Sequence, residues 1–231
     1  MLEIRNWKLG IFMTDIIPAI IADSFEDLEK KIRQIEAHAK WVQLDIMDGK
    51  FVPNKTFNDP ARLKDLKTPA SLEAHLMIEE PWLFLDDWLG SGVKRIIIHY
   101  ETVAVKAIME SMLKKTRSRG VEFALAFNPE TDWRLAGDLI SKIDMVLFLS
   151  VNPGFYGKEF ISSVLEKIRT LRESFPGVRV EVDGGIKPGL VKMVADAGAD
   201  GLVVGSYIFG SDDPAEAINK LKKGIEAVII R

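Results

Sequence analysis

The sequence predicts a single (β/α)8 barrel, and three observations support this fold class. Short apolar runs rich in β-branched residues alternate eight times with longer amphipathic segments. Several runs are apolar on successive residues, which is typical of parallel strands buried on both faces. The chain has 231 residues, near the usual size of one such barrel. An open doubly wound sheet is the alternative, but eight regularly repeated units favour closure into a barrel.

Eight apolar runs are the candidate strands, taken here in chain order. They are Ile16–Ala22, Trp41–Met47, Ser71–Met77, Val93–His99, Val121–Phe127, Ile143–Val151, Val178–Val182 and Gly201–Val204. No long linker or change of composition divides the units, so we expect one barrel domain over residues 13–231. Residues 1–12 precede the first strand and form a predicted N-terminal extension.

Segments of helical period connect these strands. The first begins with a capping box at Ser24 and Asp27, and we expect its helix to run to about Ala39. Its apolar stripe consists of Leu28, Ile32 and Ile35. The predicted stripe of the sixth helix consists of Phe160, Ile161, Val164, Leu165, Ile168 and Leu171. The positions where helices would hand over to the next strand hold Gly120, Gly177 and Gly198.

The composition excludes several classes of protein. The chain is 47% hydrophobic and 28% charged, which is ordinary for a soluble globular protein. Its net charge of −3 is spread along the chain, so we expect neither nucleic-acid nor membrane partners. No apolar run approaches the roughly 20 residues of a membrane helix. The absence of cysteine excludes disulfides and thiolate chemistry, and we expect a cytoplasmic protein.

Glycine-containing loops follow predicted strands six, seven and eight, at the end of the barrel where active sites of this fold lie. The candidate phosphate-binding residues in these loops are Gly154, Phe155, Tyr156, Gly157, Gly184, Gly185, Gly205 and Ser206. A phosphate dianion needs several converging N–H donors, and glycine lets the backbone approach it closely. One glycine pair alone is most simply a turn. Three such loops at one rim predict a phosphate site.

Two carboxylates and an imidazole lie near the ends of three predicted strands. Asp45 interrupts an otherwise apolar strand and shares a face with Gln43, because alternate residues of a strand point to the same side. A buried carboxylate is costly unless it is paired or binds a metal. Asp183 alone could be a turn residue, and His75 alone could be a hydrogen-bonded core histidine. Together they predict a site for a divalent ion such as zinc, iron, manganese or cobalt.

These motifs resemble one known family. The run Trp41–Asn54 is similar to the second-strand signature of the ribulose-phosphate 3-epimerases. The stretches that follow in the family's order are His75–Ile78, Val151–Phe155, Glu181–Ile186 and Gly205–Gly210. The resemblance covers the chain from about Ile16 onward.

The resemblance implies an isomerase of the pentose phosphate pathway that interconverts ribulose 5-phosphate and xylulose 5-phosphate. Asp45 and Asp183 would be the acid–base pair on opposite faces of C3. One divalent ion, held by Asp45, His75 and Asp183, would stabilise an enediolate intermediate. The implied substrate-binding residues are Met47, Met77 and Asn152. The substrate partner would be a small phosphorylated sugar, and we also expect a homo-oligomer.

Two departures from the family pattern fall on the site. Gln43 stands where a metal-binding histidine is usual, and it offers only a weaker amide oxygen to a transition metal. Ala19 replaces a serine and has no hydroxyl for the substrate. These changes leave open metal binding by three protein ligands, little metal dependence, or a paralogue that binds sugar phosphates without turnover. An epimerase of another sugar phosphate is a further alternative. A decarboxylase or aldolase ranks last, because Asp45 lacks the Asp-x-Lys pattern.

Overall fold

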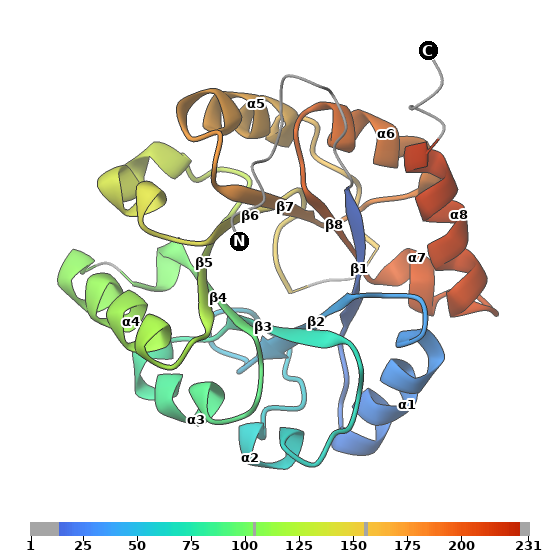
Figure 1. Ribbon diagram of the computed structural model, residues 1–231, viewed down its shortest axis with the longest axis horizontal. Coiled ribbons are helices and arrows are strands. Elements are labelled where there is room, and N and C mark those ends of the chain that lie inside the picture. The colour runs from blue at the N-terminus through green and yellow to red at the C-terminus, as the bar shows by residue number, and fades with distance from the viewer. Residues whose placement is uncertain (1–13, 104, 155–156, 227–231) are drawn as a thin grey trace.

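The computed structural model describes residues 14–103, 105–154 and 157–226, which form one closed barrel of parallel strands (Figure 1). The strands are β1 (Asp15–Ile20), β2 (Trp41–Met47), β3 (Ser71–Met77), β4 (Arg95–His99), β5 (Glu122–Phe127), β6 (Met145–Leu149), β7 (Arg179–Asp183) and β8 (Gly201–Val204). Each strand pairs with the next in sequence, and β8 pairs with β1, where Ile17 lies opposite Val203. The predicted fold class is confirmed. The predicted extension, residues 1–12, lies outside the described residues.

Helices surround the barrel (Figure 1). The α-helices are α1 (Phe25–Ile35), α2 (Pro60–Leu63), α3 (Leu85–Leu89), α4 (Lys106–Ser118), α5 (Val164–Ser174), α6 (Pro188–Asp196), α7 (Ser206–Phe209) and α8 (Pro214–Glu226). The 3-10 helices are η2 (Pro81–Leu83), η3 (Tyr100–Thr102) and η4 (Trp133–Ser141). Within the described ranges, no helix is long and apolar enough to cross a bilayer.

Element boundaries differ from the predictions where apolar residues continue beyond the regular structure. β2, β3 and β8 begin and end as predicted, β4 and β5 differ by one or two residues at the start, and β1, β6 and β7 differ by one or two residues at both ends. Ile143 and Val151 are buried but lie outside β6. The predicted stripe of the sixth helix is wrong at its start, because Phe160 and Ile161 precede α5. The N–H of Ile161 donates instead to the carbonyl of Ser150 at 2.8 Å.

The first helix illustrates how a local signal sets one end of an element. The side chain of Ser24 accepts a hydrogen bond from the N–H of Asp27 at 3.2 Å, so the predicted cap forms. The helix ends at Ile35 rather than near Ala39.

Between β5 and β6 the connection is the 3-10 helix η4, which is interrupted at Gly137 with φ 57° and ψ −128°. This conformation is non-helical and therefore interrupts the helix. Glycine adopts it readily because it has no Cβ.

Side chains that point into the barrel form one apolar group and two polar groups. The apolar group consists of Ile17, Ala19, Ile97, Ala124, Ala126, Met145, Leu147, Leu149 and Val203. One polar group lies at the amino ends of the strands, where Arg95 on β4 forms ion pairs with Glu73 and Glu181 at 2.5 and 3.0 Å. The other polar group lies at the carboxyl ends of β2, β3 and β7. On β4 the apolar Ile97 lies between Arg95 and His99, whereas on β3 and β7 the buried Glu73 and Glu181 come directly below His75 and Asp183, two positions earlier in each strand.

Candidate active site

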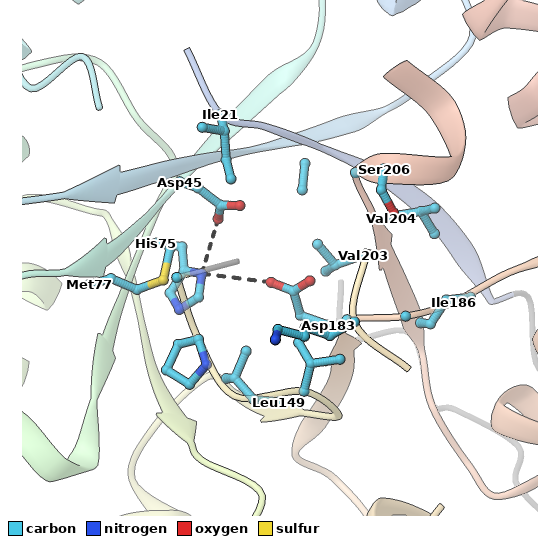
Figure 2. Close-up of a pocket in the computed structure, with 18 of the residues that line it drawn as sticks. Ile21, Asp45, His75, Met77, Leu149, Asp183, Ile186, Val203, Val204 and Ser206 are labelled. Carbon is cyan, nitrogen blue, oxygen red and sulfur yellow. Dashed lines mark hydrogen bonds and ion pairs between the residues drawn. The ribbon is translucent and has the colours of Figure 1, made fainter. Parts of the chain in front are cut away.

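The acidic and imidazole side chains predicted to act together do meet at the carboxyl ends of the strands. The register of β2 and β3 places Asp45 beside His75, and His75 Nδ1 lies 3.1 Å from Asp45 Oδ1. Asp183, from β7 on the far side of the barrel, has its Oδ2 atom 3.7 Å from the same nitrogen. Figure 2 shows the two carboxylates pointing toward each other, with His75 between them.

A cavity of about 560 Å³, including the part open to solvent, lies above this cluster. Asp45 and Asp183 both line it, with 8% and 15% of their side chains exposed. The predicted substrate-binding residues Met47 and Met77 line it as well. Asn152 is exposed and is not among the lining residues. A ligand in this cavity would therefore contact both carboxylates and an apolar wall.

Burial changes the protonation of the acidic pair. Burial, together with the negative charge of Asp45, raises the pKa of Asp183 to about 7. Near neutral pH the carboxyl group of Asp183 is therefore protonated much of the time. A pair in which one carboxyl holds a proton and the other is ionised can act as acid and base in the same reaction.

The side chain of Gln43 contacts Asp45, His75 and Asp183. Its side chain is fully buried, and Nε2 lies 2.8 Å from Asp45 Oδ1 and 2.8 Å from Asp183 Oδ2. The same nitrogen is 3.2 Å from His75 Nδ1. The sequence predicted Gln43 as a weak or lost metal ligand. The structure instead places its amide nitrogen within hydrogen-bonding reach of all three other side chains.

A second histidine orients the first. His75 Nε2 lies 2.9 Å from His99 Nε2, and His99 Nδ1 lies 3.3 Å from Glu101 Oε2. Burial lowers the pKa of His99 to about 4, so this imidazole is neutral. If Glu101 accepts the Nδ1–H of His99, His99 Nε2 must accept the Nε2–H of His75. The Nδ1 lone pair of His75 then faces the cluster, where it can accept a hydrogen bond or bind a cation.

The glycine loops line the same cavity. Described lining residues from the predicted phosphate site are Gly154, Gly157, Gly184, Gly185, Gly205 and Ser206. Phe155 and Tyr156, which were predicted with them, lie outside the described residues. Ser206 lies across the cavity from His75 (Figure 2). The three loops and the acidic cluster therefore form the walls of one pocket.

Two polar residues that the sequence did not single out hold these loops. The hydroxyl of Ser150 lies 2.6 Å from the carbonyl oxygen of Gly184 and is fully buried. The side-chain amide of Asn54 donates to the carbonyl of Gly154, which ties the loop after β2 to the loop after β6. Both residues lie within or beside the motifs quoted above. Their place in these motifs indicated that they lie near the site, but the sequence did not show that they contact the carbonyl groups of Gly184 and Gly154.

The fold and the site together define a (β/α)8 barrel with a polar, glycine-lined pocket at the rim where enzymes of this fold carry their active sites. The model of the ribulose-phosphate 3 epimerase family matches residues 15–209, and the chain belongs to this family.

Relatives of known name match over nearly the whole chain. The cytoplasmic isoform of ribulose-phosphate 3-epimerase from Oryza sativa subsp. japonica is 32% identical over 217 residues, covering 91% of this chain and 94% of that protein. The ribulose-phosphate 3-epimerase of Synechocystis sp. is 36% identical over 210 residues, covering 88% of this chain and 90% of that protein. Similarity at this level and coverage supports the family assignment over the whole barrel.

Solved structures of other proteins share the fold. A 3-hexulose-6-phosphate synthase matches with a TM-score of 0.72 and 17% identity, over 92% of this chain and 100% of that chain. KGPDC from Streptococcus mutans in complex with D-R5P matches with a TM-score of 0.75 and 13% identity, over 94% and 99%. At these identities the likeness shows the fold alone.

Proposed function

We propose that the protein interconverts ribulose 5-phosphate and xylulose 5-phosphate by inverting C3. The observation that carries this proposal is the placement of Asp45 and Asp183, which face each other across the glycine-lined cavity. The membership of the ribulose-phosphate 3-epimerase family supports the same substrate and reaction. We infer that the phosphorylated sugar lies between the two carboxylates.

Inversion at C3 requires proton transfer on both faces of one carbon. The hydrogen on C3 is acidic because the adjacent ketone can take up the negative charge as an enediolate. One carboxylate removes this proton, and the carboxylic acid on the opposite face supplies a new one. In the reverse direction, Asp45 and Asp183 exchange these roles. The raised pKa of Asp183, about 7, supports these acid and base roles, because one carboxyl group must hold the proton at neutral pH.

The cluster also has donor atoms that fit a divalent ion. Asp45, His75 and Asp183 each offer one ligand atom, and these atoms all lie within 4.8 Å of one another. Carboxylate oxygens and an imidazole nitrogen suit zinc, iron, manganese or cobalt, and we propose that these three residues would hold such an ion whenever it displaces the amide of Gln43. When bound, the ion would supply Lewis-acid stabilisation of the enediolate charge. The buried amide of Gln43, 2.8 Å from both carboxylates, favours weak binding of the ion.

The phosphate group is assigned to the glycine loops after β6, β7 and β8. Gly184 and Gly185 have φ values of 114° and 64°, a backbone conformation that residues with a side chain rarely adopt. A Cβ on Gly184 would lie 2.4 Å from Val151 Cγ2. These positions therefore keep the backbone open, and their N–H groups, with those of Gly205 and Ser206, can approach an anion.

Gly185→Ala should raise the KM for ribulose 5-phosphate by about tenfold or more, equivalent to about 1.4 kcal/mol of lost binding. The added Cβ would lie 2.8 Å from the backbone nitrogen of Phe160 and 2.9 Å from the carbonyl oxygen of Lys158, so backbone must move. Steady-state kinetics measures the effect. Gly189→Ala is the matched control, because nothing lies within 4 Å of its Cβ position. Equal KM values for the two variants would contradict the phosphate assignment.

The direct test is proton exchange with ribulose 5-phosphate in heavy water, with and without added Zn²⁺ or Mn²⁺. We expect deuterium at C3 and the appearance of xylulose 5-phosphate, both followed by NMR. The control is the double variant Asp45→Asn with Asp183→Asn, which should show neither. An absence of deuterium at C3 under every condition would exclude epimerisation of this sugar.

A second candidate is a protein that binds sugar phosphates without turnover. Ala19 favours it, because this residue lines the cavity without the hydroxyl that the family's serine provides. Binding of ribulose 5-phosphate by calorimetry, together with no exchange at C3, would support this candidate. Ala19→Ser combined with Gln43→His should then restore exchange.

A further inference from the structure

We propose that the side-chain amide of Gln43 is a built-in substitute for the divalent cation of this site. The amide nitrogen lies between the two carboxylates and beside His75, and its two N–H groups hold the carboxylates by hydrogen bonds in place of metal–ligand bonds. Gln43 is then a positioning residue, and a metal ion must displace its amide in order to bind. The positioning role in catalysis rests on the proposed function, whereas the competition with metal does not.

The distances place the amide in the volume that an ion would need. Nε2 of Gln43 lies 2.8 Å from Asp45 Oδ1, 2.8 Å from Asp183 Oδ2 and 3.2 Å from His75 Nδ1. These are the three side chains whose ligand atoms gather within 4.8 Å of one another. A transition-metal ion would sit about 2.0–2.2 Å from the same three atoms. Ion and amide nitrogen would therefore overlap, so only one of them can occupy the site.

The chemistry of the neighbours determines which end of the amide points inward. Both carboxylate oxygens are acceptors, and when Glu101 accepts from His99 the Nδ1 lone pair of His75 is directed at the cluster as well. An amide NH2 group carries two hydrogens and suits such surroundings, whereas an amide oxygen would be repelled by them. Hydrogen bonds from N–H to carboxylate are among the stronger ones in proteins.

The opposite end of the amide supports this orientation. Gln43 Oε1 is buried and has no hydrogen-bond partner among the described residues. Leaving a buried carbonyl unpaired is unfavourable, so the inward bonds of Nε2 must outweigh that cost. A side chain whose main task was to ligate a metal would present this oxygen to the ion. In this chain the oxygen points away from the acidic pair.

One amide can position both acidic residues. Its two N–H groups reach one oxygen on Asp45 and one on Asp183, two side chains that are 138 positions apart in the sequence. The second oxygen of each carboxyl group is then left for the substrate. Without a donor between them, two carboxyl groups in a buried cluster would repel each other whenever both are ionised. The amide removes the need for a resident cation to hold them together.

The experiment is a calorimetric titration of Zn²⁺ alone into metal-free wild type, Gln43→Ala and Gln43→His. We expect Gln43→Ala to bind Zn²⁺ at least about tenfold more tightly than wild type. This variant keeps the three ligand side chains and removes the amide from the position that the ion would occupy. Gln43→His, with a fourth ligand, should bind one equivalent at least about 100-fold more tightly than wild type. Circular dichroism and thermal unfolding confirm that each variant is folded before it is titrated.

Proton exchange at C3 provides the second measurement. In the presence of a chelator, wild type should keep most of its exchange rate, and Gln43→Ala should lose about 100-fold and recover with Zn²⁺. Binding of Zn²⁺ to wild type as tight as to Gln43→Ala would overturn the inference. So would an undiminished exchange rate in chelator-treated Gln43→Ala. If no variant exchanges at all but the Zn²⁺ affinities follow the expected order, the proposed epimerisation fails while the amide–metal competition stands.

Discussion

Asp183→Asn should lower kcat for epimerisation by at least about 10³-fold and leave KM within about threefold of wild type. Asparagine has the size of aspartate, so Gln43 can still donate to its side-chain oxygen and the cavity keeps its shape. An amide, however, can neither take up nor release the proton at neutral pH. General acid–base catalysis typically contributes about 10²–10⁴-fold, and in the proposed reaction Asp183 serves as base in one direction and as acid in the other.

The two aspartates are distinguished by exchange without inversion. In heavy water, Asp183→Asn should still exchange the C3 proton of the epimer that Asp45 deprotonates, while Asp45→Asn should exchange that of the other epimer. Asp15→Asn is the control, because Asp15 begins β1 at the opposite end of the barrel and its loss should leave kcat within about twofold. Loss of exchange for the same epimer in both variants would contradict the opposed two-aspartate arrangement.

Arg95→Met should lower the free energy of unfolding by about 3–5 kcal/mol. Arg95 is 2% exposed, and its Nη1 lies 2.5 Å from Glu73 and 3.0 Å from Glu181, both fully buried. Burial and the charge of Glu181 already raise the pKa of Glu73 well above its usual range, and Arg95 opposes this rise. Methionine fills similar space but leaves the two carboxyl groups without their shared cation.

Denaturant unfolding at neutral pH measures this loss. The matched control is the triple variant Arg95→Met, Glu73→Gln and Glu181→Gln, which removes Arg95 together with its two fully buried carboxylate partners and should recover most of the stability. Because Arg95 pairs with Glu73, Glu122 and Glu181 and not with Asp45 or Asp183, kcat of the folded Arg95→Met protein should stay within about threefold of wild type. A change in unfolding free energy below about 1 kcal/mol would show that the network is not required for stability.

The sequence could predict the barrel because the relevant pattern is local. Continuous apolar runs indicate strands buried on both faces, and β2, β3 and β8 begin and end at the residues that this pattern predicts. The same pattern misplaced the ends of β6 and the start of α5. Val151 is buried outside β6 and Phe160 packs against the core ahead of α5, and an apolar residue type does not reveal whether the backbone there is strand, helix or loop.

The meeting of Asp45, His75 and Asp183 was predictable for a related reason. Alternation within a strand and the rule that active sites lie at carboxyl ends bring Asp45, His75 and Asp183 to one rim from their positions alone. The buried network around Arg95 was not predictable in this way. Arg95 and Glu181 are 86 positions apart, and neither residue type indicates a partner inside a barrel.

By itself the sequence determined the alternating βα order, the inward faces of the strands and the set of loops at the rim, because periodicity and glycine placement act over a few residues. The tertiary structure alone decided which way the Gln43 amide points, that His99 and Glu101 orient His75, and that Ser150 ties down Gly184. The directions of those hydrogen bonds depend on donors and acceptors that only closure of the barrel brings within about 3 Å of one another.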